Sequence, residues 1–329
     1  MVGTLPVAAV QIEARPGRLA DNLAQVERLA GEAFAAGARL VALPEFFTTP
    51  LITGAPSSEA VLPAGDNQAL DLLRRLAREH GGAIGGSFLV ADRGEVYNRY
   101  HYVQADGRVF THDKDLPTMW ENAFYTGGSD DGVFDTDIGG VGAAVCWELI
   151  REQTVARLRG RVDLAITGTH WWDMPDNWPG VPTLLGPISQ FNRYLSEQAP
   201  VEFARRLGVP VIQASHGGRL RGEFHFLPGL DLRVPYATRF VGATQIVAAD
   251  GTVLASRNAL DGPGWVAAEI ETGAIEPRAP AEPGRYWIPR LPLLHRLYWH
   301  HQNWVGRSLY RRRGRDAGLR AARRAGEGT

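Results

Sequence analysis

The segment 141–150 reads VGAAVCWELI and places Cys146, the only cysteine of the chain, directly after a short apolar run. The small and β-branched residues of 141–145 predict a buried strand, and the spacing of Leu149, Val155 and Leu158 predicts a helix over 148–159. A thiol between a strand and a helix N-terminus lies where free backbone N–H groups favour the thiolate. A lone cysteine is also commonly an inert buried side chain. Its position alone therefore leaves both interpretations open.

Strands and helices alternate on both sides of this segment. Short apolar runs predict buried strands at 7–10, 40–45, 83–90, 164–168, 209–214 and 265–270. Apolar residues at helical spacing predict helices over 19–36, 66–80 and 195–207. Glycine-containing turns predict hairpins over 98–114, 134–145 and 239–256. This alternation is typical of an α/β fold in which sheets pack between outer layers of helices.

The composition of the 329 residues sets limits on partners and location. Hydrophobic residues make up 44% and charged residues 22%, which is typical of a globular protein with a full core. A net charge of −1 gives the chain no electrostatic reason to bind nucleic acid or anionic membranes. One cysteine cannot form an internal disulfide, and no signal peptide or transmembrane stretch is recognisable. We therefore expect a cytoplasmic protein without nucleic-acid or membrane partners.

Two stretches depart from the alternation of strands and helices. The segment 171–192 holds Trp171, Trp172 and Trp178 among four prolines, which predicts a long aromatic loop. Such a loop either caps a pocket or forms a stabilised surface excursion. From residue 277 onward, aromatic residues precede a run rich in arginine, so we divide the chain into a main domain, 1–276, and an extension, 277–329.

The extension admits several interpretations. A solvated or disordered tail, or an arm that reaches a neighbouring subunit, is favoured over a nucleic-acid patch because the body of the protein is not basic. His300 and His301 are adjacent in sequence, which is poor spacing for metal ligands on a helix. We therefore expect neither a metal site nor a cofactor.

Three charged residues share the strand-end setting of Cys146. Glu45 ends the apolar run 40–45, where a carboxylate is costly unless it is partnered or functional. Lys114 ends the first predicted hairpin, and Glu121 follows seven positions later. Each alone is commonly a structural or surface charge, but together with the cysteine they indicate a site.

These residues carry a resemblance to a known family. The motifs PEFF at 44–47, KDLPTMWE at 114–121 and VCWE at 145–148 resemble those of the nitrilase superfamily of carbon–nitrogen hydrolases. The resemblance implies a four-layer α-β-β-α sandwich within 1–276 and a catalytic triad of Glu45, Lys114 and Cys146, with Glu121 as a fourth functional residue. It also implies a homodimer or larger homo-oligomer to which the extension contributes.

The residue types suit the chemistry that this resemblance implies. Cys146 would attack the carbon of a small-molecule amide or nitrile, Glu45 would accept and return the proton, and Lys114 would stabilise the developing negative charge. Glu121 would position substrate or water, and the N–H of Trp147 would be a second donor. The side chains expected to form pocket walls are Phe46, Trp120, Trp147, Trp171 and Trp172.

Alternatives to hydrolysis remain open on the sequence. The Cys-Trp-Glu triplet resembles that of nitrilases, but amidases and nitrilases use the same four residues. A soluble N-acyl or amide transferase would form the same thioester and pass it to an amine. A non-catalytic binding protein that retains the fold is less consistent with four intact functional residues.

Overall fold

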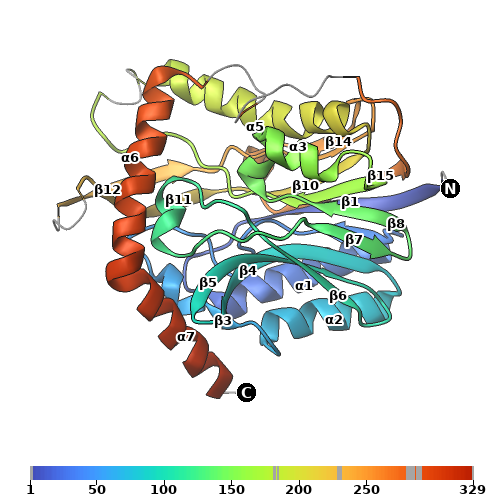
Figure 1. Cartoon of the computed structure of the whole chain (residues 1–329), viewed down its shortest axis with the longest axis horizontal. Coiled ribbons are helices and arrows are strands. Elements are labelled where there is room, and N and C mark those ends of the chain that lie inside the picture. The colour runs from blue at the N-terminus through green and yellow to red at the C-terminus, as the bar shows by residue number, and fades with distance from the viewer. Residues whose placement is uncertain are drawn as a thin grey trace.

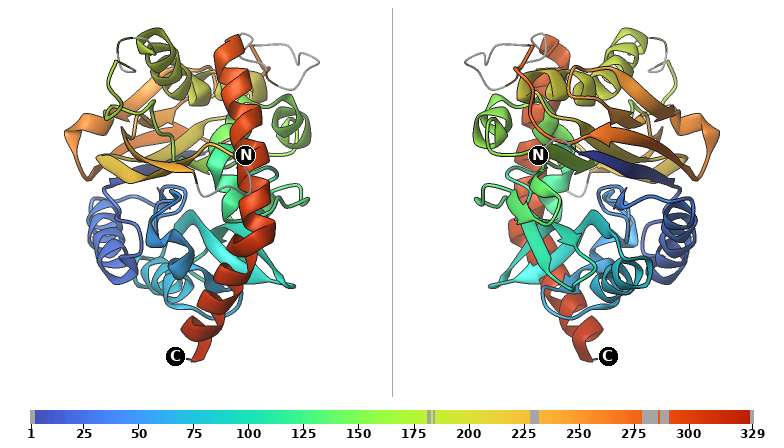
Figure 2. Two further views of the ribbon diagram at one scale, coloured as in Figure 1. Left: turned by 90° about the vertical axis from the view of Figure 1, so that its left-hand side faces the viewer. Right: turned by 90° about the vertical axis from the view of Figure 1, so that its right-hand side faces the viewer.

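The computed structural model describes residues 3–180, 183, 185–227, 232–278, 286 and 291–327. Two sheets lie face to face at its centre (Figures 1 and 2). The first contains β1 (Thr4–Ile12), β2 (Leu40–Ala42), β3 (Leu62–Pro63), β4 (Ala83–Asp92), β5 (Glu95–Val103), β6 (Val109–Asp113) and β15 (Gly264–Glu271). The second contains β7 (Val133–Thr136), β8 (Gly139–Ala143), β9 (Leu164–Gly168), β10 (Val211–His216), β13 (Thr244–Val247) and β14 (Val253–Arg257).

The two sheets are joined at one end by a short parallel pairing of β1 and β10, with Gln11 opposite Ser215 and Ile12 opposite His216. The central strands β1, β2 and β4 run parallel in the first sheet, as do β8, β9 and β10 in the second. Their carboxyl ends therefore meet at one edge of the sandwich, which is where parallel sheets place functional loops.

Helices cover the outer faces of both sheets (Figure 2). Helices α1 (Leu19–Ala35) and α2 (Gln68–His80) pack on the first sheet, and α3 (Glu152–Leu158) and α5 (Gly186–Leu207) lie over the second (Figure 1). Helix α2 shows why these boundaries form: the Asn67 side chain accepts hydrogen bonds from the N–H groups of Ala69 and Leu70, and Gly81 ends the helix at φ 62°. The predicted α-β-β-α sandwich is confirmed.

Two local predictions differ from the structure around the second sheet. The helix expected over 148–159 is divided into a 3₁₀ turn, Cys146–Ile150, and α3, because Arg151 between them is extended at ψ 131°. The fully buried Arg151 guanidinium binds Asp115 there, which fixes the break. Helix α5 begins at Gly186, so the last part of the expected loop 171–192 is helical; Pro187 lies in its first turn, where a missing N–H costs nothing. Residues 181, 182 and 184 of that loop lie outside the described residues.

A further hairpin was not predicted. Strands β11 (Arg219–His225) and β12 (Arg233–Arg239) form a separate two-stranded sheet. Their sequences alternate charged and apolar residues without a continuous apolar run, so they give little signal of a strand. Trp178 from the aromatic loop packs edge-on against Phe224 and Tyr236 of this hairpin.

The C-terminal extension is helical where the structure describes it. Helix α6 (Leu293–Leu309), a π-helical turn (Tyr310–Gly314) and α7 (Arg315–Glu327) run along the side of the sandwich (Figure 1). The Tyr310 hydroxyl accepts a hydrogen bond from the Val96 N–H at 3.0 Å and donates one to Glu95. A disordered tail is therefore wrong for 291–327. The division at residue 276 and an arm that crosses to a partner stay predictions.

No helix within the described part of the chain is both long and apolar enough to cross a membrane. The cytoplasmic location expected from the sequence stays a prediction.

Candidate active site

Glu45, Lys114 and Glu121 meet in a buried ion cluster between the sheets. The Lys114 ammonium donates to Glu45 Oε1 and to Glu121 Oε2, each at 2.8 Å, and all three side chains are fully buried. Glu121 Oε2 also accepts hydrogen bonds from the Thr118 N–H at 3.0 Å and the Tyr125 hydroxyl at 2.5 Å. An ammonium has three N–H donors, so one remains after both carboxylates are bound. This geometry brings together three of the residues that the sequence analysis selected.

Cys146 lies against the same cluster. Its thiol interacts with the Glu45 carboxyl group and with the backbone of His170. The residue is 1% exposed and has φ 54°, a left-handed conformation that costs free energy in a non-glycine residue. Phe46, which directly follows Glu45, and Met119, two residues before Glu121, have φ 55° as well. Backbone strain at three positions around one cluster is characteristic of a functional site.

The protonation states follow from burial and from the ion cluster. Burial raises the pKa of Glu45 from 4.5 to about 7, although Lys114 opposes the shift. Burial would lower the pKa of Lys114, but Glu121 and Glu45 outweigh it and hold the pKa well above its usual value. Burial and the nearby Glu45 raise the pKa of Cys146. The resting thiol is therefore protonated, and the expectation that its position favours the thiolate is wrong.

Two further residues hold Glu45 in place, and neither was predicted from the sequence. Asn98 on β5 donates from Nδ2 to Glu45 Oε1 at 2.8 Å, and the His170 N–H donates to Glu45 Oε2 at 2.9 Å. A Cβ atom on Gly168, which ends β9, would lie 2.4 Å from the Glu45 nitrogen, so only glycine allows this approach. His170 follows the end of β9 much as Glu45 follows the end of β2. This position after a strand was the one feature of the sequence that could have marked His170 as a site residue.

Comparisons with known proteins identify the family of this chain. The model of the carbon–nitrogen hydrolase family matches residues 6–278. The chain belongs to the carbon–nitrogen hydrolase family. Among curated relatives, an omega-amidase from Xenopus laevis is 32% identical over 141 residues, which cover 39% of this chain and 50% of that protein. A cyanide hydratase from Armillaria gallica is 24% identical over 198 residues, 55% of this chain and 56% of that protein. The chain spans about half the length of the curated relatives it matches.

Solved structures of carbon–nitrogen hydrolases share the fold. A superfamily protein from Xanthomonas campestris has a TM-score of 0.61 at 18% identity, over 82% of this chain and 91% of the other. A mutant amidase from Nesterenkonia sp. AN1 has a TM-score of 0.59 at 20% identity, over 81% and 90% of the two chains. In that amidase, the acetamide moiety of fluoroacetamide is covalently attached to the active-site cysteine.

In this member of the carbon–nitrogen hydrolase family, a second buried ion cluster supports the Cys146 turn from behind. Glu148 Oε2 accepts hydrogen bonds from the Val145 N–H at 2.6 Å and from His112 Nε2 at 2.9 Å, and His112 Nδ1 contacts Asp130 at 2.5 Å. Burial would raise the pKa of Glu148, but His112 and Arg157 hold it well below its usual value. The glutamate of the Cys-Trp-Glu triplet is thus a structural anion that fixes the turn carrying Cys146.

Replacing His112 by alanine should destabilise the protein and remove a pH dependence. Burial would lower the pKa of His112, but Glu148 and Asp130 raise it from 6.5 to about 9. The protonated form therefore stabilises the fold fully below pH 6.5, and this contribution is lost as the pH rises through 9. Urea unfolding at pH 6.5 should show a loss of about 3 kcal/mol in the variant, since breaking a buried pair costs roughly this much.

The free energy of unfolding of the unmodified protein should fall between pH 6.5 and 9. In the His112→Ala variant this fall should be much smaller, because only the contributions from the raised pKa values of Glu45 and Cys146 remain. Replacement of the exposed His300 by alanine is the matched control and should leave the fall intact. The same fall in His112→Ala as in the unmodified protein would contradict the assignment.

The aromatic residues expected as pocket walls divide into two groups. Trp147, Trp171 and Trp172 line a small cavity beside the ion cluster. Among the described residues, Trp120 lies behind this lining and stacks on Trp172 at 4.0 Å between ring centroids. Phe46 also lies behind it, edge-on to His170 at 5.3 Å. The start of the aromatic loop therefore forms part of a cavity wall.

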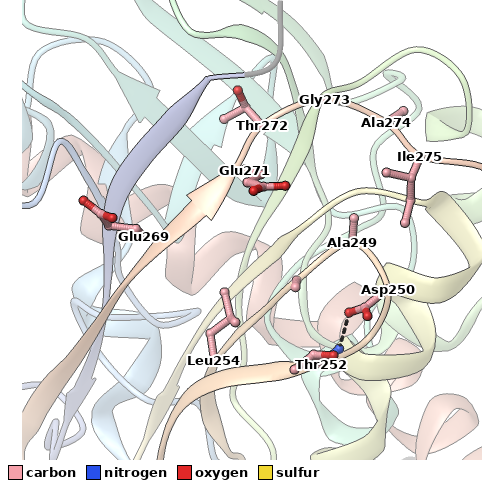
Figure 3. A pocket seen from close by; sticks show the side chains of 11 residues that line it. Ala249, Asp250, Thr252, Leu254, Glu269, Glu271, Thr272, Gly273, Ala274 and Ile275 are labelled. Carbon is pink, nitrogen blue, oxygen red and sulfur yellow. Dashed lines mark hydrogen bonds between the residues drawn. The ribbon is translucent and has the colours of Figure 1, made fainter.

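A larger hollow lies away from these residues. It measures about 570 Å³ and is formed by the turn after β13 and by the end of β15, with Asp250, Glu269 and Glu271 among its lining residues (Figure 3). Its lining includes neither Cys146 nor any residue of the ion cluster. The size of this hollow therefore does not mark the active site. Among the described residues, no group of three histidine, cysteine or acidic side chains is placed to hold a metal ion.

Proposed function

We propose that this chain is a thiol hydrolase that cleaves the carbon–nitrogen bond of a small amide or nitrile through a covalent intermediate on Cys146. The observation that carries the proposal is the arrangement of one buried ammonium between two carboxylates, with the thiol against one of them. The covalent cysteine adduct of the Nesterenkonia amidase supports it. The omega-amidases and cyanide hydratase among the relatives support amides and nitriles as the substrate class.

The geometry assigns a role to each residue in amide cleavage. Cys146 Sγ forms a bond to the amide carbon while its proton passes to the Glu45 carboxylate. The third N–H of Lys114 stabilises the negative charge that develops on oxygen. Glu45 then gives its proton to the leaving nitrogen, the C–N bond breaks, and an amine or ammonia departs, leaving a thioester.

Hydrolysis of the thioester uses the same groups in reverse. Water attacks the thioester carbon as Glu45 accepts a proton from it, and the C–S bond breaks. Glu45 returns the proton to sulfur, so that the acid is released and the thiol is restored. Glu121 holds Lys114 at a fixed position, and its second oxygen, Oε1, is buried without a hydrogen-bond partner among the described residues. This atom would orient the substrate nitrogen or the attacking water.

The test of the proposed function is ammonia release over a panel of uncharged, acidic and basic amides and of nitriles, with the second product identified. Free acid from an amide is the expected result. Product formed on an added amine in place of the acid would favour the transferase. Neither ammonia nor a transfer product with any panel member would favour a binding protein that retains the fold.

The activity should depend on pH through Glu45. The carboxylate that accepts the thiol proton must be ionised in the free enzyme, and its pKa is about 7. The value of kcat/KM should therefore fall about tenfold for each pH unit below 7 and level off above it. In Glu45→Gln the residual activity should lack this inflection. An unchanged inflection in Glu45→Gln would assign the titration to another group.

We further propose that the chain forms a homodimer or a larger homo-oligomer through the outer face of α6. Leu293, Leu297 and Trp304 lie on one stripe of this helix and are 69%, 57% and 56% exposed. Light scattering should therefore give at least twice the mass of one chain at micromolar concentration. The variant Leu297→Glu/Trp304→Glu should shift the protein toward the monomer. A monomeric unmodified protein would contradict this proposal.

A further inference from the structure

The cavity beside the ion cluster is very small. Its volume is about 10 Å³, which is room for about one water molecule. The side chains that line it are uncharged residues from five parts of the chain: Met119, Trp147, His170, Trp171, Trp172, Met174, Asn192 and His295. A carboxylate or an ammonium group of a substrate would find no opposite charge in this lining, and burying an unpaired charge is costly.

His170 connects this cavity to the reacting atoms. The backbone N–H of His170 donates a hydrogen bond to Glu45 Oε2, and the His170 backbone also interacts with the Cys146 thiol. His170 is at the same time one of the residues that line the cavity. Trp147, which directly follows the nucleophile, lines the cavity as well. A substituent on the carbon attacked by Cys146 would therefore extend into this space.

The imidazole of His170, a residue that lines the cavity, carries one hydrogen-bond donor when it is neutral. Its Nε2 accepts a hydrogen bond from the Leu51 N–H at 3.2 Å, so the proton of the neutral ring is on Nδ1. Apart from an interaction with the backbone of His170 itself, this buried Nδ1 has no partner among the described residues. Nδ1 of His295, a residue that is 2% exposed, also lacks a partner there. By contrast, the Asn192 amide already has hydrogen-bond partners: its Oδ1 accepts from Trp171 Nε1, and its Nδ2 donates to the Trp172 carbonyl.

Helix α6 supplies the wall at His295 and holds it in place. Asn303 on the same helix accepts hydrogen bonds from the Met119 N–H and from Asn122, each at 2.9 Å. The family match ends at residue 278, so this wall belongs to the chain's own C-terminal extension. The Phe191 ring meets the His295 ring edge-on at 6.1 Å, which leaves the imidazole little freedom to withdraw.

We infer that the substrate carries, on its reacting carbon, an uncharged substituent of about one or two heavy atoms that includes a hydrogen-bond acceptor, and that His295 sets the size limit. This inference rests on the proposed function and names its substrate class. A hydroxymethyl group fits these requirements, because its oxygen accepts from His170 Nδ1. An ethyl group of similar size leaves that buried donor unpaired, which costs binding.

The experiment measures kcat/KM for ammonia release from acetamide, glycolamide, propionamide, butyramide, hexanamide and benzamide. Glycolamide should exceed propionamide by about tenfold or more, because a site with a buried donor discriminates against an analogue that lacks the acceptor. Within the alkyl series, kcat/KM should fall about tenfold for each methylene beyond propionamide.

Two neighbouring residues of α6 provide the matched variants. His295→Ala enlarges the cavity and should raise kcat/KM for butyramide relative to acetamide about tenfold. Arg296→Ala alters an exposed side chain next to it and should leave the ratio unchanged. Far-UV circular dichroism and thermal unfolding show that each variant is folded before its ratio is interpreted.

Different outcomes separate this inference from the proposed function. Turnover that is fastest with hexanamide or benzamide, or faster with propionamide than with glycolamide, overturns the size and acceptor requirements while the hydrolase stands. An unchanged ratio in folded His295→Ala overturns the role of His295. No turnover of this series by a protein that releases ammonia from an acidic or basic amide or from a nitrile overturns the inference alone. No ammonia and no Cys146 adduct with this series or with any acidic amide, basic amide or nitrile overturns the proposed function, and the inference with it.

Discussion

Replacing Cys146 by alanine should lower kcat for ammonia release by at least about 10⁴-fold, because loss of a nucleophile removes the covalent pathway altogether. The thiol is buried beside Glu45 and has no disulfide partner, so its removal should change the structure little. Ammonia release from the best substrate of the panel, measured with enzyme in excess, detects residual turnover.

The control for Cys146→Ala is a measurement of the fold in the same variant. Deleting one sulfur atom from a packed site should cost about 1 kcal/mol in the free energy of unfolding. The left-handed backbone at Cys146 is strained in both proteins, since alanine also has a Cβ atom. Turnover within tenfold of the unmodified protein in a folded variant would show that another group is the nucleophile.

Replacing Lys114 by methionine should reduce both stability and activity. The change leaves the carboxylates of Glu45 and Glu121 buried without their shared cation, which should cost about 3–5 kcal/mol in the free energy of unfolding. Loss of the donor that stabilises the developing charge should lower kcat by at least about 10²–10³-fold. Lys114 is the only lysine of the sequence, so the variant has no other ammonium side chain that could replace it.

A double variant separates the two effects of Lys114. Lys114→Met/Glu121→Gln removes one of the two carboxylates and should recover much of the lost stability, because a single buried carboxyl group can stay protonated. It should not recover activity. Urea unfolding and single-turnover ammonia release measure the two quantities. A double variant that regains both would show that Lys114 serves the fold alone.

The sequence was sufficient to predict the central cluster because each of its residues combines an unusual position with a specific motif. Glu45 follows an apolar run, Lys114 follows a hairpin, and Cys146 follows a second apolar run. The structure brings Glu45, Lys114 and Glu121 into hydrogen-bonding distance and places the thiol beside them. The alternation of strands and helices, which local periodicity encodes strongly, predicted sheets packed between outer helices. The four-layer sandwich was implied by the family resemblance.

Residues whose role depends on tertiary packing could not be predicted. Asn98 lies on β5 among residues of ordinary strand pattern, and only the packing of β5 beside Glu45 gives it a function. His295 lies far from the motifs in sequence, and its role depends on where α6 docks. The protonated thiol was also missed, because burial and a neighbouring carboxylate raise its pKa although its place after a strand favours the thiolate.

Intact-mass spectrometry after rapid acid quenching tests the covalent mechanism most directly. The unmodified protein, mixed with excess of its best amide substrate, should gain the mass of the substrate minus ammonia. Peptide analysis should place this mass on Cys146, and Cys146→Ala should not acquire it. Steady ammonia release from a protein whose Cys146 stays unmodified at every quench time would contradict the account.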